Sequence, residues 1–594
     1  MMQSKHLSKA VLISSASIVT LAFVAIAAQT VDWSEVGKNF KDTAVTEQVE
    51  LTEADQETAP PQETLLDAIV PTPQPVQPAP DRNRANAKTS GGGLLSLHSS
   101  VPSSAGQSRI MLPPDPGRTL VQTEDRERFA SADPNPLRQV SKDPVSTFSI
   151  DVDTASYSFI RSNLNGGYTP NPDAVRVEEM INYFDYDYRV PEEGHAPFAT
   201  SVSVFETPWN KHTKLMQVGI QGYKVPLEDL PPQNLVFLID TSGSMADANK
   251  LPLLQQSFRL LLSTLRDEDE VAIVTYAGSA GVLLEPTKVT EKSLILEKIN
   301  ALTSGGSTAG HAGLKGAYAL AEKMTGEGEQ TRVILATDGD FNVGLADTES
   351  LKRFVTDKRK QGTALSVLGF GRGNYNDELM QTLAQNGQGV AAYIDTLSEA
   401  RKVLVDQVVS SISMIAQDVK IQVEFNPATV AEYRLIGYET RALKTEDFKN
   451  DKVDAGDIGA GHNVTAIYEV TPVGSPAQKF SDLRYGDGGE TFEPVSGSHQ
   501  GELAYVKLRY KTPGAENSQL IETAVTDDSN DIPREETLFA ASVASFGQLL
   551  KGSDYLGDWS YEDAEKLAKD NMGADRFGYR SEYLSLVRLA QVTE

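Results

Sequence analysis

The chain has 594 residues, which is too long for a single hydrophobic core and indicates several domains or long linkers. Its formal net charge is -28, from 82 acidic and 54 basic residues. This excess of acidic residues argues against nonspecific binding to nucleic acid or anionic lipid and favours cationic partners or metal ions. The chain contains no cysteine, which excludes disulfides, thiolate catalysis, zinc–thiolate sites and the lipid attachment of a lipoprotein.

The first 30 residues predict export. Lys5 and Lys9 precede an uncharged run, residues 10–28. This run fits a cleaved signal peptide, for which Ala25-Ile26-Ala27 offers a cleavage site, and it fits a retained membrane anchor equally well. In either case we expect an exported protein. Export without any cysteine for disulfides favours a bacterial source, in which the protein would lie in the cell envelope, either periplasmic or anchored in the inner membrane and facing the periplasm.

Composition divides the rest of the chain. Residues 31–141 are rich in Pro, Gln and Ser without a sustained apolar period, and predict a disordered linker. Residues 142–230 predict an N-terminal flanking segment of helices and paired strands, and residues 417–594 predict a β-rich region followed by helices. The simplest architecture is therefore a β-rich module contributed by both flanks, from which a central domain emerges.

The central region, residues 231–416, predicts an α/β fold. Short apolar strands alternate with amphipathic helices throughout it. The strands are expected at 235–240, 270–277, 282–287, 332–338, 364–370 and 391–395, and the helices at 249–265, 291–302, 309–324, 349–361, 376–386 and 398–412. Such alternation is typical of a doubly wound, mostly parallel sheet, whose ligand site lies at the carboxyl ends of the strands.

Oxygen-bearing side chains follow the first strand of this region. Asp240 ends the strand, and Ser242 and Ser244 follow in the sequence DTSGSM before a helix begins. Positions i, i+2 and i+4 of such a loop can bring three oxygens to one cation, and hard ions such as Mg²⁺ prefer oxygen ligands. Taken alone, the loop is better explained as turn and helix-capping chemistry, for which Ser is a preferred residue.

Two later positions strengthen the metal interpretation. Thr308 in GGSTAG and Asp338 in ATDGD supply further oxygens at the ends of later elements. In this order and spacing, DTSGSM, GGSTAG and ATDGD resemble the metal-ion-dependent adhesion site (MIDAS) of von Willebrand factor type A (vWA) domains. The flanks also resemble those of a bacterial family of exported or envelope-attached vWA proteins.

The resemblance implies a role for each of the five positions. Ser242 and Ser244 would be direct metal ligands, and Thr308 a direct or water-bridged ligand. Asp240 and Asp338 would act largely through bound water. The metal is expected to be Mg²⁺, with Mn²⁺ or Ca²⁺ as alternatives, and a Glu or Asp carboxylate of a partner protein would complete its coordination.

These expectations predict a non-catalytic, metal-dependent protein-binding function of the adhesion or scaffold type, with no catalytic residues. The main alternative is a metal-dependent, phosphohydrolase-like enzyme that uses Asp151 or Asp153 of FSIDVDTAS, or the loop 338–342. The residues after Asp151 and Asp153 do not match the motif of such enzymes. A calcium-binding loop over 338–349 has its glycine out of register. An envelope protein with an unused metal site remains a third hypothesis. His311, beside the proposed site, is expected at its rim or on a helix surface.

Overall fold

The computed structural model describes residues 129, 133–150, 153–192, 196–306, 310–339, 348–372, 376–407, 413–481, 499 and 501–593. All of them belong to the unit Pro114–Glu594. The predicted signal or anchor and most of the predicted linker lie outside the described residues, so both stay predictions. Within the described ranges, no helix combines the length and the apolar character needed to cross a membrane.

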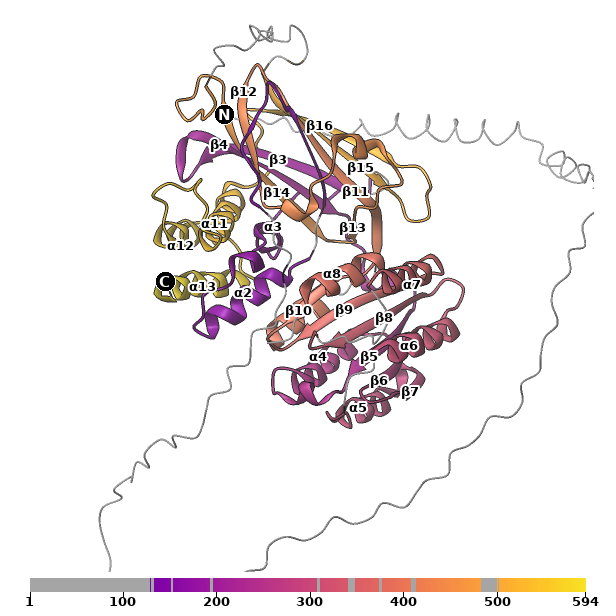
Figure 1. The fold of residues 1–594 in the computed structure, drawn as a ribbon. Helices are drawn as coiled ribbons and strands as arrows, with labels where there is room; N and C mark the ends of the chain where they lie inside the picture. Colours follow the sequence, from indigo (N-terminus) through magenta and orange to yellow (C-terminus); the bar gives the residue numbers. More distant parts are fainter. Residues whose placement is uncertain are drawn as a thin grey trace, which may run out of the picture. The chain divides into compact units, whose positions relative to one another are not determined.

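A six-stranded sheet forms the centre of the α/β region (Figure 1). Its strand order is β10-β9-β8-β5-β6-β7, and all neighbours pair in parallel except β6 and β7. The strands are β5 (Gln233–Asp240), β6 (Glu270–Tyr276), β7 (Ala280–Lys288), β8 (Gln330–Thr337), β9 (Thr363–Phe370) and β10 (Ala391–Ile394). The prediction of a mostly parallel sheet is confirmed.

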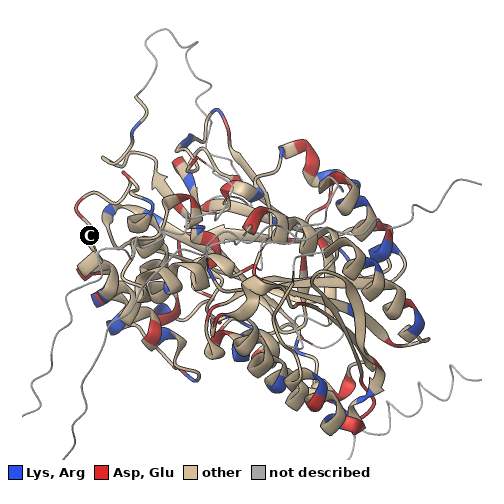
Figure 2. Cartoon of the chain, turned by 60° about the horizontal axis from the view of Figure 1, so that its bottom comes forward, with Lys and Arg blue, Asp and Glu red and all other residues tan. Residues whose placement is uncertain are grey.

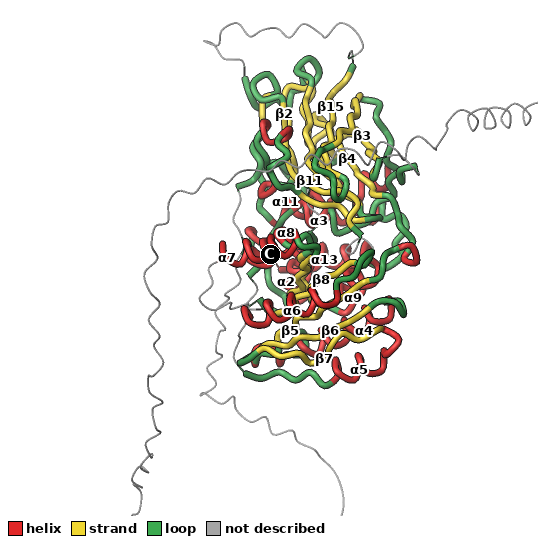
Figure 3. Tube along the Cα trace, turned by 90° about the vertical axis from the view of Figure 1, so that its right-hand side faces the viewer, coloured by secondary structure: helices red, strands yellow, loops and turns green. Residues whose placement is uncertain are grey.

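Helices cover both faces of this sheet, which makes it doubly wound (Figure 3). One face packs against α4 (Leu251–Thr264), α5 (Lys292–Asn300) and α9 (Leu397–Arg401). The other face packs against α6 (Gly310–Met324), α7 (Thr348–Lys360) and α8 (Asp377–Asn386). Every residue of β5 is buried, as expected of a strand covered on both sides.

The last helix of the α/β region is less regular than its sequence predicts. After α9 the chain continues as a π-helical segment, η5 (Lys402–Asp406), and residues 408–412 of the predicted helix lie outside the described residues. Lys402 begins this segment, and its buried ammonium lies 4.2 Å from the ring centroid of Tyr183 in the N-terminal flank. Contacts with the flank therefore accompany the departure from α-helical geometry.

Two antiparallel sheets take strands from both sides of the α/β region. The first has the order β1-β12-β14-β4-β3, and the second has the order β13-β11-β15-β16 with β2 paired to β11. The strands before the α/β region are β1 (Arg138–Gln139), β2 (Val145–Ser149), β3 (Phe198–Thr207) and β4 (Asn210–Gly222). Those after it are β11 (Met414–Phe425), β12 (Val430–Ile436), β13 (Gly456–Gly459), β14 (Asn463–Pro472), β15 (Glu502–Lys511) and β16 (Gln519–Thr526). The predicted β-rich module built from both flanks is confirmed.

Apolar cores lie on both faces of the first antiparallel sheet. One core packs it against the second sheet, and the other packs it against helices. Those helices are α2 (Ala155–Asn165), α3 (Val177–Ile181), α11 (Arg534–Leu550), α12 (Tyr561–Asp570) and α13 (Tyr579–Thr593). The predicted carboxyl-terminal helices are therefore confirmed, and they pack together with helices from the N-terminal flank.

Two parts of the module differ from expectation. Residues 133–141, which composition assigns to the linker, contain β1, and Val140 is buried in the core between the sheets. The sequence pattern also misses β12, because Glu432 and Arg434 interrupt its apolar residues. Both side chains are buried with partners: Arg434 donates to Glu469 at 2.7 Å, and Glu432 accepts backbone N–H groups at 2.7–3.1 Å. Tertiary hydrogen bonds allow a strand that local pattern disfavours.

Charged residues of both signs are interspersed along the helices (Figure 2). Some form ion pairs at the surface, such as Arg588 with Glu565 at 2.7 Å. Exposed pairs of this kind contribute only about 0–1 kcal/mol each. The apolar cores and a small number of buried ion pairs are therefore the main determinants of stability.

Candidate metal centre

The loop after β5 folds its oxygen-bearing side chains toward one another. Asp240 is fully buried, and its Oδ1 accepts a hydrogen bond from the backbone N–H of Ser242 at 2.8 Å. The chain then makes a short turn, η3 (Gly243–Ala246), which brings the hydroxyls of Ser242 and Ser244 to 2.9 Å from each other. The spacing of this motif therefore produces the convergence that the sequence predicts.

A second loop lies directly against the first. Gly243 donates its backbone N–H to the carbonyl of Gly306 at 3.1 Å, and Gly305 donates to the carbonyl of Thr241 at 2.7 Å. Gly306 has a φ of +94°, a conformation that favours glycine, so this close approach depends on residue type. The predicted ligand Thr308 lies outside the described residues, and its role stays a prediction.

Asp338 reaches the same place from the end of β8. Because β8 and β5 pair in parallel, with Ile239 opposite Ala336, their carboxyl ends meet at one edge of the sheet. Asp338 is fully buried, and its Oδ2 accepts a hydrogen bond from Nζ of Lys250 at 3.0 Å. The structure thus brings together four of the five predicted ligands, namely Asp240, Ser242, Ser244 and Asp338.

One buried oxygen supports a cation at this place. Oδ1 of Asp338 has no hydrogen-bond partner among the described residues, although it is shielded from solvent. Leaving a buried carboxylate oxygen unpaired costs free energy, and a cation or its bound water would remove that cost. The residues present therefore fit a hard divalent ion, which would be held by two serine hydroxyls with support from two carboxylates.

The electrostatics of the site point in the same direction. Burial raises the pKa of Asp240 above its ordinary value, and the negative charge of Asp338 adds to this effect. The backbone N–H and hydroxyl of Ser242 oppose the shift. A buried carboxylate with a raised pKa, such as Asp240, favours either a proton or a metal ion.

Solvent exposure increases across the site, from a buried floor to an exposed rim. Asp240 and Asp338 are inaccessible, whereas Gly243 and Ser244 are exposed. Among the described residues of the site, Gly243 and Ser244 therefore offer a side on which a ligand from outside can approach. His311 lies in the first turn of α6, and its Nδ1 is shielded from solvent and has no partner within the part of the chain that is described.

Sequence reasoning missed Lys250, which directly contacts a predicted ligand. A lysine just before a helix is usually a solvated surface residue, and the loop motif gives it no special place. Only the packing of its side chain, which is 6% exposed, shows that its ammonium belongs to the site.

The carboxylate Asp153, considered for a hydrolase, lies at the other edge of the sheet. Its carboxylate accepts hydrogen bonds from Arg441 at 3.0 Å and from the backbone N–H of Ala391 at 3.4 Å. Ala391 begins β10, so Asp153 lies at the amino ends of the parallel strands, whereas Asp338 lies at their carboxyl ends. Asp151 and residues 340–347 lie outside the described residues.

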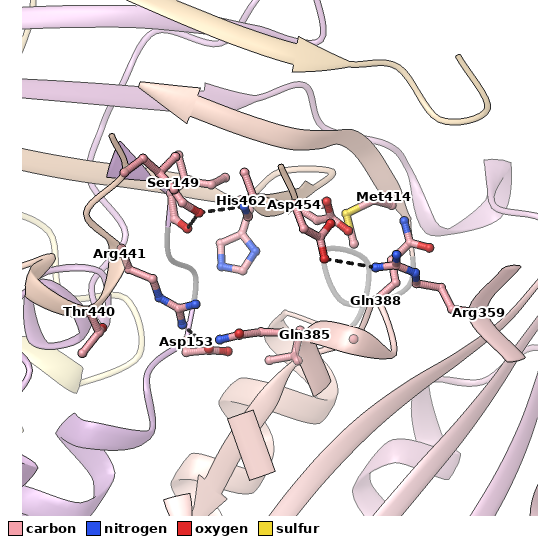
Figure 4. A pocket seen from close by; sticks show the side chains of 18 of the residues that line it. Ser149, Asp153, Arg359, Gln385, Gln388, Met414, Thr440, Arg441, Asp454 and His462 are labelled. Carbon is pink, nitrogen blue, oxygen red and sulfur yellow. Dashed lines mark hydrogen bonds and ion pairs between the residues drawn. The ribbon is translucent and has the colours of Figure 1, made fainter. Parts of the chain in front are cut away.

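Asp153 lines a cavity of about 240 Å³ between the α/β region and the β-rich module (Figure 4). Arg441 and Gln385 lie near Asp153, while the His462 ring lies between this group and Asp454, which pairs with Arg359 at 3.7 Å. Both polar and apolar groups line the cavity, and two ion pairs, Asp153 with Arg441 and Asp454 with Arg359, lie in its wall. It is separate from the candidate metal centre.

Two titratable groups of this cavity have opposite effects on stability. Burial raises the pKa of Asp457 to about 7, with Asp418 and Asp454 adding to the shift and Arg359 opposing it. Burial lowers the pKa of His462 to about 4, opposed by the charge of Asp185 and reinforced by Lys402. The folded state keeps Asp457 protonated up to about pH 7, so the free energy of unfolding falls as pH rises from about 4 to about 7. The folded state keeps His462 neutral down to about pH 4, so this histidine makes the free energy of unfolding rise between about pH 4 and pH 6.5.

We expect the Asp457→Asn variant to reveal the histidine effect alone. Its free energy of unfolding should rise between about pH 4 and pH 6.5, by at most about 1.4 kcal/mol per pH unit relative to wild type. Urea unfolding at several pH values measures this difference, with the exposed Asp528→Asn as control. Parallel pH profiles for Asp457→Asn and wild type would contradict the assigned shift.

Three family models match the chain. The von Willebrand factor type A domain model matches residues 234–407. A model described as von Willebrand factor matches residues 123–217, and the model of the C-terminal region of uncharacterized protein YfbK matches residues 410–592. The chain is similar to uncharacterized protein YfbK of Escherichia coli (strain K12), with 44% identity over 478 residues, covering 80% of this chain and 82% of that protein.

Solved structures give weaker likenesses. A von Willebrand factor type A protein from Catenulispora acidiphila is 15% identical, with 66% of this chain and 89% of that chain covered and a TM-score of 0.35. Proximal thread matrix protein 1 from the mussel byssus, solved with a zinc-occupied MIDAS motif, is 24% identical, with 30% and 45% covered and a TM-score of 0.26. Scores this low support no conclusion about this chain.

The family matches agree with the order of elements along the chain. The α/β region with its loop site falls in the vWA match, a fold that supports metal-dependent binding and generally mediates protein binding. The two regions that build the antiparallel sheets fall in the flanking matches. The chain therefore belongs to the YfbK family of vWA domain proteins, in which family-specific regions flank the domain on both sides.

Proposed function

We propose that this protein is a non-catalytic, divalent-metal-dependent protein-binding module of the bacterial cell envelope. Mg²⁺ is the expected ion, with Mn²⁺ or Ca²⁺ as alternatives, and Thr308 completes the ligand set with Asp240, Ser242, Ser244 and Asp338. A Glu or Asp carboxylate of a partner protein binds at the exposed side of the metal. The module adheres to or scaffolds its partner and does not transform it.

The observation that carries this proposal is the buried Oδ1 of Asp338, which has no partner among the described residues. It lies at the edge of the sheet where the loop that carries the Ser242 and Ser244 hydroxyls also begins. Hydroxyl ligands contribute no negative charge, so a divalent ion held by them keeps a strong attraction for an external anion. Ser244 lies at the exposed rim, which is where that anion would arrive. This arrangement supports binding of a carboxylate from outside.

The phosphohydrolase alternative receives no comparable support. Asp153 and Asp338, two of the carboxylates considered for this alternative, lie at opposite ends of the parallel strands and so do not share a cleft. Asp153 is also held by Arg441. We therefore favour binding over catalysis.

The location at the envelope rests on sequence features alone. The uncharged run after Lys9 and the long linker that follows it favour export and display of the folded region away from the membrane. With a net charge of -28, the chain is a poor partner for nucleic acid.

Calorimetric titration of Mg²⁺ and Mn²⁺ into the full chain tests the metal site. We expect a saturable heat for wild type and none for the double variant Ser242→Ala/Ser244→Ala, because both proposed direct hydroxyl ligands are removed. Ser263→Ala is the matched control, since Ser263 is an exposed serine of the same domain at the end of α4. Equal heats for wild type and the double variant would refute the assignment.

A pull-down from envelope extract tests the binding function itself. A true partner should be recovered by wild type with Mg²⁺, and should be lost with EDTA or with Ser242→Ala/Ser244→Ala. The site carboxylate of that partner is then found by replacing its exposed Asp and Glu residues. A partner retained equally under all three conditions would contradict metal-dependent binding.

A further inference from the structure

Lys250 is built into the candidate metal centre. It ends the loop that starts at Asp240, and its side chain is 6% exposed. Its Nζ lies 3.0 Å from Oδ2 of Asp338 and 3.9 Å from the carboxylate of Asp247, whose side chain is 73% exposed. The ammonium therefore lies between the buried floor of the site and its rim.

A glycine at the end of β9 makes room for this lysine. Gly371 has a φ of +77°, and a Cβ atom there would lie 2.3 Å from Cε and 2.4 Å from Cγ of Lys250. The carbonyl of Gly371 is fixed by a hydrogen bond of 2.7 Å from the hydroxyl of Tyr393 in β10. A residue outside the predicted ligand loops thus leaves the space that the lysine stem occupies on its way to Asp338.

The hydrogen bond from Lys250 distinguishes the two oxygens of Asp338. It engages Oδ2, while Oδ1 has no partner among the described residues. A hydrogen bond from an ammonium to a carboxylate is charge-assisted, so the positive charge of Lys250 lies directly against a proposed metal-supporting group. Lys250 can therefore act on a bound cation, and on an anion bound to that cation, through its charge.

Formal charges show what the lysine changes. Asp240 and Asp338 contribute two negative charges, which a divalent cation would cancel, leaving a neutral site. The ammonium of Lys250 raises the total by one unit, so the buried part of the site with its cation is positive. Asp247 lies 3.9 Å from this ammonium, but its side chain is 73% exposed and solvent screens its charge. At separations of a few ångströms and an effective dielectric constant of about 20, one unit charge alters binding by more than 1 kcal/mol.

We propose that Lys250 makes the metal centre selective for an anionic partner group. Its ammonium weakens the hold on the cation and strengthens the binding of a carboxylate to the loaded site. This inference rests on the proposed metal-dependent function and adds the residue that sets its preference for anions. A lower affinity for the free cation would then accompany a higher affinity of the loaded site for an acidic residue.

The test compares Lys250→Met with wild type in the full chain. Methionine keeps an unbranched stem beside Gly371 and removes the charge. Mn²⁺ affinity is measured by calorimetry, and acetate binding to the Mn²⁺-loaded protein is measured by the water-proton relaxation lost when acetate displaces metal-bound water. We expect Mn²⁺ to bind at least about 10-fold tighter and acetate at least about 10-fold weaker in the variant.

Two further variants separate charge from folding. Lys250→Gln retains a donor for Asp338 without the charge and should follow Lys250→Met in both affinities. Lys288→Met, which removes an exposed lysine of β7, should behave as wild type. Thermal unfolding in EDTA identifies any variant that fails to fold, in which case the glutamine variant decides.

The measured affinities distinguish failure of the lysine proposal from failure of the proposed metal-dependent function. Opposite changes in the two affinities support the proposal. Unchanged affinities, or metal and acetate affinities that change in the same direction, overturn it while leaving the metal site in place. Absence of Mn²⁺ binding to wild type refutes the proposed function itself.

Discussion

Replacing Arg161 with methionine is expected to lower the free energy of unfolding of the full chain by about 3–5 kcal/mol. Arg161 lies in α2 and is fully buried. It donates to Asp395 at 2.9 Å and to Glu399 at 2.7 Å, both in the α/β region, and to Glu582 of α13 at 2.8 Å. Removing the guanidinium leaves the first two carboxylates buried without their main partner, which is costlier than losing the ion pairs alone.

Urea unfolding of the full chain measures this loss. Arg138→Met is the matched control, because Arg138 pairs with Asp143 at the surface, where both side chains are more than 40% exposed. That control should lose no more than about 1 kcal/mol. A similar loss for the two variants would show that the buried cluster does not stabilise the fold.

Arg161 contacts all three regions of the family architecture. Its guanidinium joins the N-terminal flank to the end of β10, to α9 and to the last helix. All three matched regions of the chain therefore meet at one side chain. We infer that the vWA region and its flanks stabilise one another through these shared buried contacts.

The second large effect is expected at Asp240. Asp240→Asn should weaken Mg²⁺ binding about 10- to 100-fold, because it removes a carboxylate that supports the metal. The same change should raise the melting temperature of the metal-free protein near neutral pH. Burial raises the pKa of Asp240, so stability present when it is protonated is lost as pH rises through that pKa, and asparagine does not undergo this loss.

Differential scanning fluorimetry with EDTA and with Mg²⁺ tests both parts. Asp247→Asn is the control, since Asp247 carries the same charge on the same loop but is 73% exposed. Wild-type Mg²⁺ affinity in Asp240→Asn would contradict the ligand assignment. A lower melting temperature than wild type in EDTA would contradict the destabilising role of the buried carboxylate.

The sequence alone determined the α/β fold and most of the candidate site. Apolar strands alternating with amphipathic helices predict a parallel sheet, because each element must bury its apolar face against the next. Parallel strands place their carboxyl ends at one edge of the sheet, so the sequence predicts that Asp240 and Asp338 lie near each other. Local spacing then brought Ser242 and Ser244 together.

Only the tertiary structure decided the features that depend on distant residues. Arg161 meets partners 234 and 421 positions away, and no local pattern encodes such a pairing. β12 contains charged residues that become compatible with a buried strand once their partners are known. Lys250 becomes part of the metal centre because Gly371, from another strand, admits its stem. Periodicity reports which face of an element is buried, whereas packing decides which side chains meet there.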